Sequence, residues 1–242
     1  MTSGGGTVVV VVGVDDAGTE LTRFDLAHGA DPEESLAASG LVAARLVAVG
    51  GHTEPHVVEL RYRVEGAGPQ GSGIPGGSSG VVRRTVVRDA DLHRAPDEEA
   101  YVFQRVAVYA VLRSDRGLLL TQMSDRTNAR GRWGLAGGGL DAGEEPEAAL
   151  HREVWEESGQ RVDRLQPWRV TTSHWVGRAP SGRLEDFHAV RVVYAAWCAE
   201  PTEPVVHDVG GTTQASAWFA ATELEGLPLV TSWSSLLADL PD

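Results

Sequence analysis

The pattern of apolar and polar positions over the first 65 residues predicts mainly β-strands, with one short helix between them. The helix is expected to start at Asp31-Pro32-Glu33-Glu34. Asp31 suits the N-cap, Pro32 suits the first helical position, and Glu34 completes a capping-box pattern. No cluster of catalytic residue types accompanies these elements, so we expect an accessory or dimerisation module. The runs rich in Val, Leu and Tyr, which are typical of strands, cover residues 7–14, 41–49 and 57–64.

A stretch of mostly Gly, Pro and Ser at residues 66–80 interrupts the pattern, and a second polar stretch follows at residues 88–99. Such a composition cannot support a packed element and is typical of a linker or long loop. We therefore predict an N-terminal module at residues 1–65, a linker at 66–97 and a main domain at 98–242.

In the main domain, apolar runs and helical periodicity follow one another in a mixed order, which is typical of an α/β fold. A glycine-rich turn, Gly137-Gly138-Gly139, precedes the first expected helix. The sequence predicts an α/β sandwich with a mixed sheet, preceded by the smaller β-rich module. Strands are expected at residues 101–113, 117–123, 167–176, 189–198 and 215–219, and helices at residues 146–158, 221–225 and 232–239.

Composition and charge restrict the partners. The 34 acidic and 21 basic residues, the latter all Arg, give a formal net charge of −13, whereas binding of nucleic-acid phosphates needs a basic surface. The single cysteine, Cys198, excludes an internal disulfide and a cysteine-based zinc site. The longest apolar run, residues 8–12, is too short for a membrane span, and no basic leader precedes it. We expect a soluble cytoplasmic protein with no nucleic-acid or membrane partner.

The helix expected at residues 146–158 places three acids on one face. Glu153 and Glu157 are four residues apart and Glu153 and Glu156 are three apart, so their like charges repel. Glu156 and Glu157 also lie at the helix end where the dipole disfavours anions. A hard cation such as Mg²⁺, which prefers carboxylate and phosphate oxygens, would relieve both conflicts. The alternative is an ordinary solvated acidic face.

The spacing around these glutamates resembles a known signature. Gly138, then Glu144 after five residues, then Arg152-Glu153-Val154-Trp155-Glu156-Glu157-Ser158-Gly159 after seven more, is similar to the box of the Nudix hydrolase superfamily. Two positions depart from the pattern: Gln160 replaces the usual aliphatic residue, and Ala136 replaces the usual proline before the glycines. The resemblance covers roughly residues 100–240. Residues 29–36 resemble residues 143–150 at the start of the box helix. It therefore stays open whether the N-terminal module is a degenerate Nudix-like half.

The resemblance implies a hydrolase that cleaves a nucleoside diphosphate linked to another group, by attack of water on phosphorus. Mg²⁺, or Mn²⁺ in its place, would be held by Glu153, Glu156, Glu157 and the carbonyl of Gly137. Arg152 would orient the carboxylates, and Glu144 would brace the loop before the helix. The substrate would contact Arg132, Trp133, Gln122, Gly138 and Gly139.

Several points stay open at this stage. The general base is Glu153, Glu157, or an acid of a later loop, namely Glu185, Asp186 or Asp208. His174 and His188 are interpreted as structural histidines or substrate neighbours rather than metal ligands. The favoured substrates are nucleoside triphosphates, including oxidised ones, because the short strand–turn–box layout resembles that branch. The alternatives are ADP-ribose or another nucleotide sugar, and a non-catalytic nucleotide sensor. It also stays open whether the chain forms a homodimer.

Overall fold

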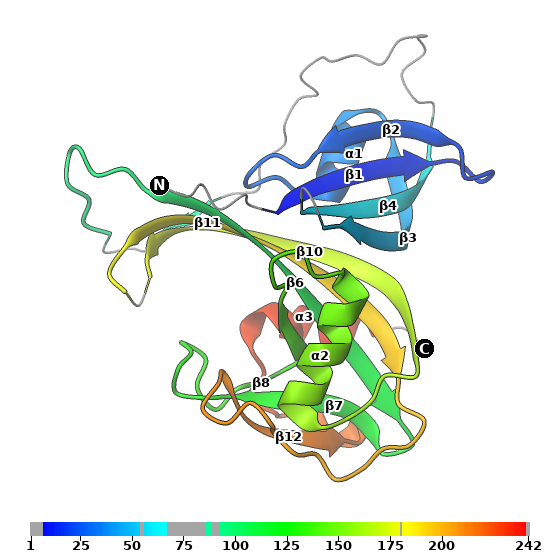
Figure 1. Cartoon of the computed structure of the whole chain (residues 1–242), viewed down its shortest axis with the longest axis vertical. Helices are drawn as coiled ribbons and strands as arrows, with labels where there is room; N and C mark the ends of the chain where they lie inside the picture. The colour runs from blue at the N-terminus through cyan, green and yellow to red at the C-terminus, as the bar shows by residue number, and fades with distance from the viewer. Residues whose placement is uncertain (1–6, 54–55, 67–85, 89–91, 180, 241–242) are drawn as a thin grey trace. The chain divides into compact units, whose positions relative to one another are not determined.

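The computed structural model describes residues 7–53, 56–66, 86–88, 92–179 and 181–240 (Figure 1). The chain divides into two compact units. One unit comprises Met1–Ala107, Leu140–Pro146 and Trp168–Val192. The other comprises Val108–Gly139, Glu147–Pro167 and Val193–Asp242. Of the predicted linker, residues 67–85 and 89–91 lie outside the described residues, and the predicted domain boundaries stay a prediction.

A small mixed sheet forms the N-terminal module. In the described part of the chain it has four strands in the order β2-β1-β4-β3, with β1 parallel to β4 and the other neighbours antiparallel. The helix α1 contacts β3. The bounds are β1 Val8–Val14, β2 Glu20–Asp25, α1 Pro32–Ala38, β3 Val42–His52 and β4 Val57–Glu65.

The burial of these strands follows from their sequences. The inner strand β1 has valine at every position except Gly13, and it is buried at every position but its first. Its neighbour β4 alternates strictly, which buries Val58, Leu60, Tyr62 and Val64. Asp31 caps α1 as predicted, because its side chain accepts hydrogen bonds from the backbone N–H groups of Glu33 and Glu34. The strand β2 was not predicted, since its polar and apolar residues leave it largely exposed.

The second sheet is also mixed. In the described residues its strands follow the order β12-β7-β6-β11-β10-β5, while β8 pairs with β7 and β9 pairs with β6. The strands are β5 Val87–Arg88, β6 Tyr101–Ser114, β7 Gly117–Met123, β8 Trp133–Gly134, β9 Ala136–Gly139, β10 Arg164–Arg178, β11 Leu184–Trp197 and β12 Thr213–Phe219. The helical segments are α2 Pro146–Ser158, η1 Ala221–Glu223 and α3 Thr231–Ala238.

The glycine-rich segment is a strand rather than the predicted turn. Gly137 has φ +143°, and a Cβ atom there would collide with the backbone carbonyl of Val108 in β6. Glycine at this position therefore lets β9 lie directly against β6. The sequence interpretation placed a turn at these three glycines, whereas in the structure Gly137 allows close backbone approach within a strand.

The helix α2 has the predicted bounds and the predicted core face. Ala149, Leu150 and Val154 are fully buried. Gly159, with φ +67°, follows the last helical residue in the left-handed conformation typical of helix ends. Figure 1 shows α2 in front of the strands β6 and β7 and α3 behind them. The fold class is therefore α/β, as the sequence predicted.

Among the described residues, no helix is long and apolar enough to cross a bilayer.

Candidate active site

Arg152 holds two carboxylates of α2 in place. Its guanidinium donates to Glu153 Oε1 at 2.9 Å and to Glu156 Oε2 at 3.2 Å. A third hydrogen bond, of 3.1 Å, runs to the carbonyl oxygen of Gly139 in β9. Planar guanidinium suits such a fork because its donors have fixed directions. The one cation of this helix face therefore ties the acids to the glycine strand and fixes their orientation.

Glu157 is the buried acid of the group. Only 5% of the residue is exposed, and both of its carboxylate oxygens accept hydrogen bonds within the protein. The backbone N–H of Gly137 donates at 2.9 Å, and the hydroxyl of Thr213 donates at 2.5 Å. Burial raises the pKa of Glu157 to about 7, and the charges of Glu153 and Asp208 add to the rise, while the two hydrogen bonds oppose it. Near neutral pH this carboxyl group is thus poised between its two protonation states.

The backbone of β9 comes very close to these side chains. A Cβ atom added at Gly138 would lie 2.5 Å from Oε2 of Glu153. Any side chain at that position would occupy the space that the Glu153 carboxylate fills. Gly137, Gly138 and Gly139 thus each lie against one of the charged groups of α2.

The donor set fits a hard divalent cation. One end of the helix α2 carries the carboxylates of Glu153, Glu156 and Glu157. Arg152 is the cationic partner of Glu153 and Glu156, and burial and like charge raise the pKa of Glu157. Oxygen donors of this kind are the ligands that Mg²⁺ prefers. Because each carboxylate oxygen has two lone pairs, the hydrogen bonds of Glu157 leave it able to bind an ion.

Glu144 acts locally in the segment before α2. Its carboxylate accepts from the backbone N–H of Asp141 at 2.9 Å, and its carbonyl oxygen accepts from Nε2 of His56 at 3.2 Å. These contacts are those of a residue that stabilises a loop, in line with the bracing role that the resemblance implies.

The three side chains expected at the substrate have backbone and side-chain partners of their own. Arg132 donates to the carbonyl oxygen of Leu229 at 3.0 Å. Trp133 packs edge-on against Phe219, with ring centroids 4.8 Å apart. Gln122 bonds through its amide to the carbonyl oxygen of Gly131 and to the side chain of Gln214. Their role toward a substrate stays a prediction.

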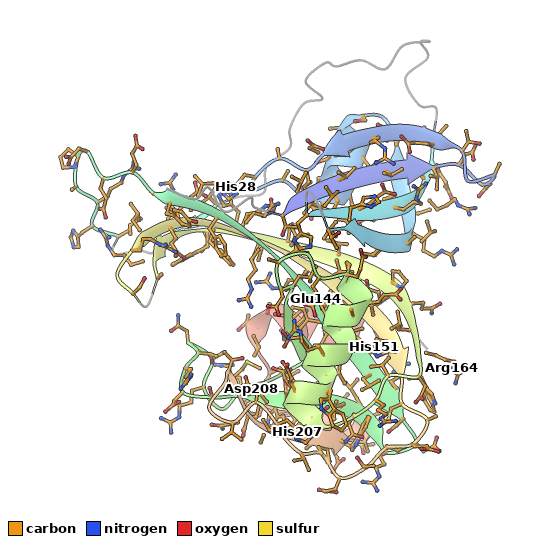
Figure 2. The ribbon with its side chains drawn as sticks, in the orientation of Figure 1. His28, Glu144, His151, Arg164, His207 and Asp208 are labelled. Atoms are coloured by element: carbon orange, nitrogen blue, oxygen red, sulfur yellow. The ribbon has the colours of Figure 1, made fainter. Side chains whose placement is uncertain are left out.

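The loop acids considered as bases have different surroundings. Asp208 is close enough to Glu157 to raise its pKa, and its backbone N–H donates to the carbonyl oxygen of Glu156. Figure 2 shows Asp208 and the neighbouring His207 beside α2. Glu185 accepts from Arg183, whereas Asp186 is held by two histidines.

Sequence reasoning missed two contributors to this site. Thr213, at the start of β12, donates to Glu157 from 56 positions away in sequence. His207 stacks on Trp155 with ring centroids 4.8 Å apart, and Trp155 stays 46% exposed. A polar residue at a strand start carries no motif of its own, so no signal in the sequence pointed to Thr213.

The hydrogen bonds of Gln160 explain how it can replace the aliphatic residue of the family pattern. It is buried, and its amide makes reciprocal hydrogen bonds with Thr202: Oε1 accepts from the backbone N–H at 3.0 Å and Nε2 donates to the hydroxyl at 3.0 Å. A satisfied amide can thus occupy a buried position that usually carries an aliphatic side chain.

Comparison with known proteins agrees with the geometry. The nucleoside triphosphatase NudI of Enterobacter sp. (strain 638) is 33% identical over 94 residues, covering 38% of this chain and 67% of that protein. NudI of Escherichia coli O139:H28 is 32% identical with the same coverage. A MutT Nudix hydrolase structure from Burkholderia pseudomallei is 31% identical, with a TM-score of 0.45, over 57% of this chain and 99% of that chain. The family model of the NUDIX domain matches residues 103–238, more than half of the chain. The predicted resemblance is confirmed: this chain belongs to the Nudix family and is a Nudix hydrolase.

Proposed function

We propose that this protein is a Mg²⁺-dependent pyrophosphohydrolase of nucleoside triphosphates. The observation that carries the proposal is the joining of Glu153, Glu156 and Glu157 to the glycine strand β9 through Arg152 and the backbone of Gly137. The NudI relatives, which are nucleoside triphosphatases at 32–33% identity, support the substrate class.

In this mechanism, Mg²⁺ would be held by Glu153, Glu156 and Glu157, with the carbonyl of Gly137 as a further ligand. When bound, the ion would supply neutralisation of phosphate charge and orientation of a water molecule. The chain's own residues set the geometry: Arg152 orients two carboxylates, and Thr213 and Gly137 fix the third. The absence of a side chain at Gly138 leaves room for Glu153 and for the phosphates. Water attacks a phosphorus atom, the bond to the bridging oxygen breaks, and a nucleoside monophosphate and pyrophosphate leave.

Asp208 is our choice among the loop acids for the general base. Its charge acts on Glu157, whereas the carboxylates of Glu185 and Asp186 are engaged by Arg183 and by two histidines. Asp208→Asn is expected to lower kcat by about 100-fold or more, the usual range for a lost acid–base group, with little change in KM. An unchanged kcat would return the role to Glu153 or Glu157.

The test of the function is turnover by the purified protein of a panel of (d)NTPs, 8-oxo-dGTP, ADP-ribose, nucleotide sugars and coenzyme A with Mg²⁺. Product masses identify the bond that is cleaved. Glu153→Gln is expected to abolish turnover, and Glu147→Gln, the same change at an exposed position of α2, is the matched control. Turnover of ADP-ribose or nucleotide sugars alone would replace the substrate class. Nucleotide binding without turnover would favour a sensor.

A further inference from the structure

A second group of metal-ligand side chains lies apart in sequence from the box helix. It consists of His28 in the loop after β2, His174 in β10 and Asp186 in β11, all within one compact unit of the chain. Oδ1 of Asp186 lies 2.8 Å from Nε2 of His28 and 2.5 Å from Nε2 of His174. The three ligand atoms lie within 4.8 Å of one another. Figure 2 labels His28.

The surroundings hold these atoms in place. The hydroxyl of Thr172, two residues before His174 on the same face of β10, donates to Oδ2 of Asp31 at 2.7 Å, and this buried bond fastens the loop that carries His28. Gly29 lies on the His174 ring: its φ is +76°, and a Cβ atom there would be 2.5 Å from Nδ1. The loop is therefore shaped to bring His28 against His174.

One polar atom of the cluster is not satisfied by the described residues. His174 is buried, with 6% of it exposed, and its Nδ1 has no hydrogen-bond partner in the described part of the chain. Burying an imidazole with an unpaired ring nitrogen costs about 1–3 kcal/mol. An apolar side chain would avoid this cost, whereas the imidazole places its other nitrogen, Nε2, 2.5 Å from Oδ1 of Asp186.

We propose that His28 Nε2, His174 Nε2 and Asp186 Oδ1 form a binding site for a divalent transition-metal ion of the Zn²⁺ type. Two imidazoles with one carboxylate are a donor set that Zn²⁺ accepts, whereas Mg²⁺ and Ca²⁺ prefer oxygen donors throughout. On binding, the hydrogen bonds to Asp186 give way to metal bonds, and each neutral imidazole carries its proton on Nδ1.

The site is open to solvent on one side. The side chains of His28 and Asp186 are 24% and 29% exposed, which gives an ion a path to the ligands. Three protein ligands leave a fourth tetrahedral position for water or an exogenous group. The neighbouring His188 is not part of this group of three ligand atoms. Its Nδ1 lies 2.9 Å from Oε1 of Gln104.

The test measures metal binding by the full chain and does not depend on catalytic activity. Protein freed of metals is dialysed against Zn²⁺ in excess Mg²⁺, which occupies the carboxylate site, and bound zinc is counted by elemental analysis. We expect one Zn²⁺ per chain. Co²⁺ used in its place should give visible absorption bands typical of a four-coordinate nitrogen and oxygen site.

The variants are His28→Ala, which changes a partly exposed loop residue, and Asp186→Asn. Each should weaken Zn²⁺ binding by at least about 100-fold, since even outer partners of metal ligands typically change affinity 10–100-fold. His52→Ala, at an exposed histidine of β3, is the matched control and should bind as the wild type does. Zn²⁺ should also raise the Tm of the wild type and of His52→Ala, but not of His28→Ala.

Two results would overturn the proposal: no saturable Zn²⁺ binding in the presence of Mg²⁺, or equal binding by all variants. Either would leave the cluster as a hydrogen-bonded ion pair. Because the nucleotide assay does not use these residues, failure here and failure of the proposed function are distinguishable.

Discussion

Glu157 shows how burial of one acid links folding to protonation. Of the four acids in α2 it is the buried one, and desolvation raises its pKa from 4.5 to about 7. The folded chain therefore holds a proton that the unfolded chain releases at lower pH. This contribution to stability is fully present below about pH 4.5 and is lost as pH rises through about 7.

The first prediction follows from the raised pKa of Glu157 and the resulting loss of stability as the pH rises. In metal-free protein, the free energy of unfolding of the wild type should fall relative to Glu157→Gln by on the order of 3 kcal/mol between pH 4.5 and pH 8. The amide stays neutral and lacks this titration. Urea unfolding at several pH values measures the difference, and Glu147→Gln, an exposed acid of the same helix, should track the wild type. Parallel profiles for wild type and Glu157→Gln would contradict the assignment.

The second prediction concerns Gly138. A methyl group there would lie 2.5 Å from the Glu153 carboxylate, and the three atoms nearest to it all belong to this side chain, which must then move. Gly138→Ala should lower kcat/KM by about 10–100-fold, as for other changes beside metal ligands, and shift the Tm by less than about 3 °C. Gly50→Ala, where a Cβ atom meets open space, is the control and should change neither quantity. Full activity in Gly138→Ala would show that the carboxylate position is unimportant.

At the scale of elements, α2 could be predicted completely and β9 could not. The helix carries its own periodicity and a family motif, so its bounds and its buried face, Ala149, Leu150 and Val154, follow from the sequence. The glycines of β9 carry no side chains and hence no pattern. Only the pairing with β6 shows that Gly137 serves close approach rather than a turn.

The third prediction concerns Gln160, which lies just after the helix α2. Gln160 occupies a buried position where the family motif has an aliphatic residue, and its Oε1 accepts from the backbone N–H of Thr202 at 3.0 Å. Gln160→Leu would restore the family residue but leave that N–H unpaired. We expect the free energy of unfolding to fall by about 1 kcal/mol, since an unsatisfied buried donor costs about 1–3 kcal/mol and the apolar side chain recovers part of it. Urea unfolding of Gln160→Leu against wild type measures it, and a gain in stability would contradict the argument.

At the scale of the whole molecule, the contacts that sequence reasoning missed are those between distant segments. Asp186 meets His28 across 158 positions, and Thr213 meets Glu157 across 56. Such pairs depend on which strands become neighbours, and local periodicity does not encode that. The interpretation of His174 as a structural histidine or substrate neighbour stays a prediction. Its contact with Asp186, and the approach of His28 to the same carboxylate, could not be predicted because His28 lies far away in the sequence.

The last prediction joins the protonation of one residue to the stability of the whole fold. In the proposed metal site, Mg²⁺ would bind the ionised form of Glu157, whose pKa is about 7 without metal. The apparent affinity should therefore drop about tenfold between pH 8 and pH 6, which corresponds to about 1.4 kcal/mol less stabilisation by Mg²⁺ above its dissociation constant. Thermal unfolding with and without Mg²⁺ at the two pH values measures this difference. In Glu157→Gln the difference between the pH values should vanish, because the titrating group is gone. A Mg²⁺ effect on Tm that is the same at both pH values in the wild type would show that Glu157 either ionises at lower pH or does not bind the ion.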